Sequence, residues 1–274
     1  MKSFIRTAFI AITSASTASV ADLSNFYLLD SLGGLYSVDG DTLYASKIHE
    51  IENGFSVVDM VDLGGGNIIV SRAYELYEYN FYTREETSLL NTADYFGPGT
   101  IGYFHGLADL GNGELFFSSR VNNQDGGLGQ GNSINLDDGT TTTLYSHEEY
   151  RSAYFDHHLI APGFVVSAQF SNQQIHVLDI NSGEETTTYN VGLDVVSFFE
   201  TNGEVFLLTK QGEIHSFDAS NGEYSFVGQL EGEFGSRNLI GASVADPLGV
   251  FPTPGSLAIF VAFGLSTTHR RRHA

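Results

Sequence analysis

Short strand-like segments repeat along this sequence with a period of about 40 residues. Residues 175–179 (IHVLD) match residues 214–218 (IHSFD), and Gly-Glu follows each at the same spacing. Residues 26–39 match residues 205–218 without a gap. Gly, Asn and Asp turns separate the segments, and no amphipathic helical pattern occurs in residues 22–247. This pattern predicts an antiparallel all-β domain.

The two ends of this domain complement each other. The unit at residues 26–39 lacks the strand that should precede it, whereas residues 245–247 repeat the start of a unit seen at residues 108–110 and then stop. A ring closed by N- and C-terminal strands explains this division, because a linear solenoid would end in a complete capping unit. Closure also removes exposed sheet edges. We therefore predict a β-propeller over residues 22–247.

The spacing predicts five four-stranded blades. They cover residues 54–92, 100–147, 150–192 and 193–230, with residues 238–247 and 25–51 forming the closing blade. A sixth blade is possible if residues 100–147 conceal another hairpin, and a β-sandwich is the alternative architecture. The phrase Gly-x-Leu/Ile-x-x-x-Asp-x-x-x-Gly resembles the repeat of secreted propellers of the NHL and quinoprotein-like kind. That resemblance implies architecture only.

The N-terminal residues 1–21 are typical of a secretory signal peptide. Lys2 and Arg6 give a positive start, an apolar stretch follows, and Ser19-Val20-Ala21 forms a small-x-small cleavage site. We therefore expect the protein to be exported.

The C-terminal residues 250–274 contain a Pro-x-Pro-Gly turn, an apolar run and a terminal Arg cluster. The run measures about 21 Å as a helix, less than the ~30 Å of a hydrocarbon core, so it is a marginal transmembrane span. This layout resembles the PEP-CTERM sorting signal, with Pro-Thr-Pro in place of Pro-Glu-Pro. The resemblance implies processing by an exosortase-like membrane enzyme and a place at the cell surface, often beside exopolysaccharide. A plain C-terminal membrane anchor is the alternative. The residues that carry the motif are Pro252, Pro254, Gly255, Arg270, Arg271 and Arg272.

Charge and cysteine content exclude several functions. The chain has 33 acidic and 12 basic residues, a net charge of −21, and no Cys. Nucleic-acid binding is disfavoured, since such proteins neutralise phosphates with Lys and Arg. Disulfide scaffolds, thiolate metal sites and Cys nucleophiles are excluded.

One candidate site is the propeller channel, which the innermost strands line. The repeat comparison places His105 at the position equivalent to Asp156, so these side chains could converge with His157 or His158 on a divalent transition metal. Neighbouring residues on a strand point to opposite faces, so His157 and His158 cannot both be ligands. The alternative is that these are hydrogen-bonded strand residues.

A second candidate is the segment 121–139, which is rich in Asn, Asp and Gly and interrupts the repeat. Its carboxylates Asp125, Asp137 and Asp138 are oxygen ligands of the kind that Ca²⁺ takes, although no EF-hand register fits. The alternative is an extended surface loop.

These observations predict a binding or scaffold protein of the cell surface or extracellular matrix. Exopolysaccharide and other surface proteins are the expected partners, and no catalytic motif marks an enzyme. A secreted hydrolase or lyase with a channel-bound metal is the alternative, because propellers support both kinds of function.

Overall fold

A computed structural model describes most of the predicted propeller. The described residues are 23–51, 57–97, 101–123, 126–147, 156–169, 173–234 and 239–244. The predicted signal peptide, the Pro motif, the apolar C-terminal helix and the Arg cluster lie outside them. Within the described residues, no helix has the length and apolar character needed to cross a membrane.

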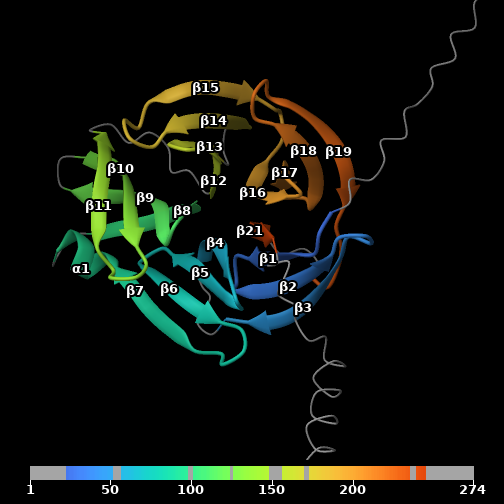
Figure 1. The fold of residues 1–274 in the computed structure, drawn as a ribbon, viewed down its shortest axis with the longest axis horizontal. Helices are drawn as coiled ribbons and strands as arrows, with labels where there is room; N and C mark the ends of the chain where they lie inside the picture. The colour runs from blue at the N-terminus through green and yellow to red at the C-terminus, as the bar shows by residue number, and fades with distance from the viewer. Residues whose placement is uncertain are drawn as a thin grey trace, which may run out of the picture.

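Five sheets stand around a central axis, and each sheet has one of its end strands nearest the axis (Figure 1). Blade 1 contains β4 (Val57–Gly64), β5 (Asn67–Arg72), β6 (Glu75–Asn80) and β7 (Glu86–Asn91). Blade 2 contains β8 (Ile101–Gly111), β9 (Glu114–Asn123), β10 (Gly126–Asn135) and β11 (Thr141–His147). Blade 3 contains β12 (Asp156–Ala161), β13 (Phe164–Gln169), β14 (Gln174–Asp179) and β15 (Glu185–Asn190). Blade 4 contains β16 (Val195–Thr201), β17 (Glu204–Thr209), β18 (Glu213–Asp218) and β19 (Glu223–Gln229).

The fifth blade joins the two ends of the domain. Its strands are β21 (Leu239–Val244), β1 (Phe26–Asp30), β2 (Gly34–Asp39) and β3 (Tyr44–Glu50). β1 and β21 are antiparallel, with Phe26 opposite Val244. The predicted closure and the prediction of five blades are confirmed, and the six-bladed and β-sandwich alternatives are wrong. The sequence did not reveal β20 (Glu231–Gly232), which pairs in parallel with the outer edge of β3.

Apolar cores lie between neighbouring blades. Side chains alternate along each strand, so Phe26 and Leu28 pack toward blade 4 whereas Tyr27 and Leu29 pack toward blade 1. Three further clusters fill the remaining junctions, between blades 1 and 2, 2 and 3, and 3 and 4. Every blade therefore depends on both of its neighbours.

The same tight turn joins the third and fourth strands of all five blades. The side-chain oxygen of its first residue accepts a hydrogen bond from the backbone N–H two positions later. The backbone N–H of its fifth residue donates to the backbone carbonyl of the first. The fifth residue has positive φ in every blade. The first residues are Asp39, Asn80, Asn135, Asp179 and Asp218, and the fifth are Leu43, Arg84, Gly139, Gly183 and Gly222.

We expect Arg84→Gly to stabilise the protein by up to about 1 kcal/mol, because Arg84 is exposed and holds a φ of 61° that suits glycine. The converse change, Gly139→Ala, should cost about 1 kcal/mol, because an added Cβ meets no atom within 4 Å and only the φ of 71° is unfavourable. Urea unfolding of both variants tests this. Equal stability of Arg84→Gly and wild type would contradict it.

The segment 121–139 is mostly not the extended loop that its composition suggested. It continues the long hairpin of β9 and β10, followed by the common turn. Strand pairing uses backbone groups, so a Gly- and Asn-rich segment pairs when its neighbour fixes the register. The interruption of the repeat therefore lengthens blade 2 without adding a blade. A short helix, α1 (Thr92–Phe96), precedes this blade and is capped by Asn91.

Candidate functional site: the central channel

The innermost strands contact one another in a closed ring, in the order β4, β8, β12, β16, β21 and back to β4. One position on each inner strand, which we call the ring position, faces the next blade. At three of the five junctions, the side chain at this position accepts a hydrogen bond from the backbone of the next inner strand. Asp59 accepts the backbone N–H of Leu107 at 2.7 Å, Asp156 accepts that of Phe198, and Ser197 accepts that of Ala242 at 2.8 Å. Polar side chains thus join the inner strands of neighbouring blades.

Glycine occupies the ring position in the other two strands. A Cβ added to Gly106 would lie 2.9 Å from the backbone nitrogen of Asp156, and one added to Gly241 would lie 3.3 Å from that of Met60. Gly106, and not His105, is therefore the structural equivalent of Asp156. The repeat comparison was one residue out of register here, because β8 has an irregularity between Phe104 and Leu107.

Two carboxyl groups meet at the centre of the ring. Asp59 and Asp156 are 0% and 3% exposed, come from strands of different blades, and hydrogen-bond to each other. A hydrogen bond between two carboxyl groups requires a proton on one of them. The channel is therefore crossed by a carboxyl pair that shares a proton.

The surroundings favour this protonated state. Burial raises the pKa of Asp59 well above its ordinary value, and the charge of Asp156 raises it further. Burial raises the pKa of Asp156 to about 7, although hydrogen bonds from Ser197, Asp59 and the backbone act in the opposite direction. Asp156 therefore begins to lose its proton near neutrality, whereas Asp59 keeps its proton when Asp156 ionises.

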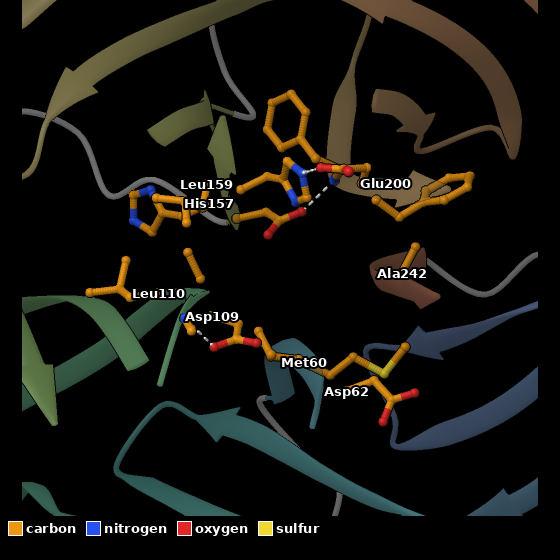
Figure 2. A pocket seen from close by; sticks show the side chains of 15 residues that line it. Met60, Asp62, Asp109, Leu110, His157, Leu159, Glu200 and Ala242 are labelled. Carbon is orange, nitrogen blue, oxygen red and sulfur yellow. Dashed lines mark hydrogen bonds and ion pairs between the residues drawn. The ribbon is translucent and has the colours of Figure 1, made fainter. Parts of the chain in front are cut away.

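The channel opens beside this pair into a cavity of about 420 Å³, which we call the channel mouth (Figure 2). All five inner strands contribute to it. Its ionisable groups are Asp62, Asp109, Asp156, His157, His158 and Glu200, and its other walls include Leu110, Leu159 and Phe199. No Lys or Arg is among the described residues that line the mouth, so its charge is acidic.

The two adjacent histidines have separate surroundings, as strand alternation predicts. Nδ1 of His157 lies 2.6 Å from the hydroxyl oxygen of Ser167. Burial lowers the pKa of His157 to about 3, and the charge of His105 contributes to this shift. His158 Nε2 donates to Glu200 Oε2 at 3.3 Å. Burial lowers the pKa of His158, against an opposing effect of Glu200. Both imidazoles are therefore neutral at neutral pH.

The predicted metal ligands are distributed differently from the expectation. Asp156 hydrogen-bonds to Asp59, and His158 to Glu200. His105 lies near Arg120, and burial followed by that charge lowers its pKa to about 4. In the described part of the chain, no group of three or more His, Asp or Glu side chains is arranged to hold a metal ion. Metal binding at the channel stays a prediction.

The predicted calcium ligands belong partly to a structural turn. Asn135 accepts the backbone N–H groups of Asp137 and Asp138, and the Asp138 carboxylate accepts both the backbone N–H and the hydroxyl of Thr140. These bonds belong to the turn that ends the third strand in every blade. Asp125 lies outside the described residues, so calcium binding by this segment also stays a prediction.

Asp59 is the main residue of this site that the sequence did not reveal. It lies in an otherwise apolar strand, and its partner is almost a hundred residues away. The detectable signal was an acidic residue between Val58 and Met60 on an inner strand, where a buried charge needs a partner.

Comparison with solved structures supports the fold. The chain is similar to a chain of a nidogen–laminin complex, with a TM-score of 0.51 and 9% identity over 82% of this chain and 99% of that one. It is also similar to a protein of unknown function from Bacteroides caccae, with a TM-score of 0.50 and 12% identity over 76% and 73% of the two chains. No protein-family model and no curated protein matches the sequence. At these identities the similarities establish a β-propeller and nothing about ligands.

Proposed function

We propose that this protein is an exported binding or scaffold module of the cell surface or extracellular matrix, and that its channel mouth receives the ligand. A PEP-CTERM-type signal recognised by an exosortase-like enzyme delivers it there. The solved structures support the propeller fold on which this proposal rests, and the sequence of the two ends supports export and sorting.

The channel mouth is the observation that carries the proposal. A concave site with apolar walls and a few polar groups is typical of ligand binding, and this mouth combines Leu110, Leu159 and Phe199 with three carboxylates at or near its rim. Because the charged rim groups Asp62, Asp109 and Glu200 are all acidic, the ligand should be neutral or positively charged. Exopolysaccharide of the surrounding matrix is the proposed partner.

Retention on extracellular matrix isolated from the producing cells tests this function. Asp109→Lys reverses a charge at the mouth and should release the protein from the matrix. Asp179→Lys is the matched control, because the half-buried Asp179 also accepts the backbone N–H two residues later but lies on an outer turn. Equal retention of both variants, or no retention of wild type, would refute a binding role for the mouth.

Sorting makes a separate prediction. Deletion of Arg270–Arg272 removes the positive cluster that should stay on the cytoplasmic side, so we expect the protein to be misrouted or released into the medium. Cell fractionation measures this, and the intact mass of the surface form should show that residues 1–21 are absent. Unchanged localisation after the deletion would contradict the sorting proposal.

A further inference from the structure

A second hollow, which we call the interblade groove, runs outward from the channel mouth along blade 4. Its volume is about 650 Å³. All four strands of blade 4 contribute, together with Ile160 on the inner strand of blade 3. The groove therefore extends from the innermost to the outermost strand. Its lining residues are Ile160, Glu200, Gly203, Glu204, Val205, Ser216, Phe217, Asp218, Ala219, Ser220, Glu223, Tyr224 and Ser225.

Glu200 connects the groove to the channel mouth. It lines both cavities, and its side chain is 47% exposed while it accepts the hydrogen bond from His158 (Figure 2). The two hollows therefore adjoin at Glu200, and together they reach from the inner strands to the outer strand of blade 4. Such a path suits an extended chain better than a compact small molecule.

The charges along this path have one sign. Glu200, Glu204, Asp218 and Glu223 line the groove, and Asp62 and Asp109 follow at the mouth. No Lys or Arg is among the described residues that line either hollow. A ligand with repeated positive charges would therefore complement the whole path.

The outer end of the groove offers an aromatic ring and hydroxyl groups. Tyr224 is 40% exposed, and its hydroxyl donates to the carbonyl of Val191 at 2.7 Å, which holds the ring in place. Ser216 and Ser225 also line the groove. An exposed aromatic ring beside carboxylates and hydroxyls suits a sugar ring, whose C–H face packs on the aromatic ring while its hydroxyls hydrogen-bond.

From these features we infer that the interblade groove binds an extended polysaccharide whose sugar units carry protonated amines. This inference rests on the proposed matrix-binding function and specifies its ligand. A basic peptide would satisfy the charges, but it would not require the ring of Tyr224.

Calorimetric titration of the full chain with a glucosamine hexamer tests the inference. The N-acetylglucosamine hexamer is the matched control ligand, since it has the same rings without the positive charge, and we expect it to bind at least tenfold more weakly. Glu204→Gln and Tyr224→Ala should each weaken binding of the charged hexamer about three- to tenfold. Tyr224→Phe keeps the ring but not its hydrogen bond to Val191, so it should weaken binding less than Tyr224→Ala.

Matched variants outside the groove serve as controls. Glu114→Gln changes the equivalent first residue of the second strand in blade 2, and Tyr44→Ala removes a similarly exposed tyrosine from the outer strand of blade 5. Neither should alter binding.

If oligolysine binds as tightly as the glucosamine hexamer and Tyr224→Ala has no effect, the ligand class is wrong. If the hexamer binds but Glu204→Gln and Tyr224→Ala behave as wild type, the groove is overturned while matrix binding stands. If the hexamer does not bind while matrix retention is intact, the amino-sugar ligand is wrong and matrix binding stands.

Discussion

The free energy of unfolding should fall as the pH rises from about 4 to about 7, by up to about 1.4 kcal/mol per pH unit for each of the buried carboxyl groups Asp59 and Asp156. Between the ordinary carboxyl pKa and the raised pKa of Asp156, the folded protein keeps a proton that the unfolded chain has lost. This stabilisation is complete below the carboxyl pKa of the unfolded chain, and it is lost as the pH rises through the pKa that the group has in the folded protein. Urea unfolding at a series of pH values measures the slope.

Below pH 4 the opposite trend should appear. Turn hydrogen bonds lower the pKa of Asp39, Asp138, Asp179 and Asp218. Protonating these carboxylates removes stabilising bonds, so stability is lost as the pH falls through their folded values. The protein should therefore be most stable on the acidic side of neutrality.

Asp156→Asn should reduce the slope without abolishing it, because the buried Asp59 keeps a raised pKa, and it should make the protein more stable than wild type at pH 8. The amide can donate to Asp59 without a shared proton and still accept the N–H of Phe198. Asp109→Asn, at an exposed carboxylate of the same mouth, is the control and should keep the wild-type slope. An unchanged slope in Asp156→Asn would show that Asp156 holds no extra proton in the folded protein.

Removing the N-terminal strands should abolish the cooperative fold. A chain that begins at residue 57 lacks β1, β2 and β3, which leaves β21 without its strand partner and opens two interblade cores. Losing both cores should cost more free energy than the ~5–15 kcal/mol by which folded domains are typically stable. Circular dichroism and thermal unfolding should show no cooperative transition.

A circular permutant provides the matched control. Phe26 lies directly opposite Val244, so a short turn can join residue 244 to residue 26 and turn the closing blade into an ordinary one. A permutant that starts at residue 57 and ends at residue 51 keeps every strand and should fold. A truncated chain that melts like the full domain would refute closure by β1 and β21.

Sequence reasoning located the blades because turn chemistry repeats along the chain. Asp179 with Gly183 and Asp218 with Gly222 punctuate the strands, and each element needs only local residues to be recognised. Closure was also predictable, since residues 26–39 match a complete unit but lack its first strand. These features depend on spacing, which a sequence displays directly.

The channel chemistry was less accessible. Asp156 was identified as a channel residue, but its partner Asp59 was not, because their contact depends on blades 1 and 3 meeting across the axis. A one-residue irregularity in β8 moved His105 away from the ring position and placed Gly106 there. The Asn- and Gly-rich segment that forms β10 gave no apolar alternation, so its pairing with β9 was missed. Side-chain partners distant in sequence require the register of each strand, which spacing alone does not fix.

Site-specific fluorescence tests whether this ring of five blades binds its ligand at the channel mouth. The chain has no Cys, so Leu110→Cys at the mouth and Tyr82→Cys on an outer turn of blade 1 each give a single labelling site. Adding matrix polysaccharide from the producing cells should change the emission of a fluorophore at residue 110, in a saturable way, and leave that at residue 82 unchanged. Equal responses at both positions, or a response at residue 82 alone, would contradict binding at the channel mouth.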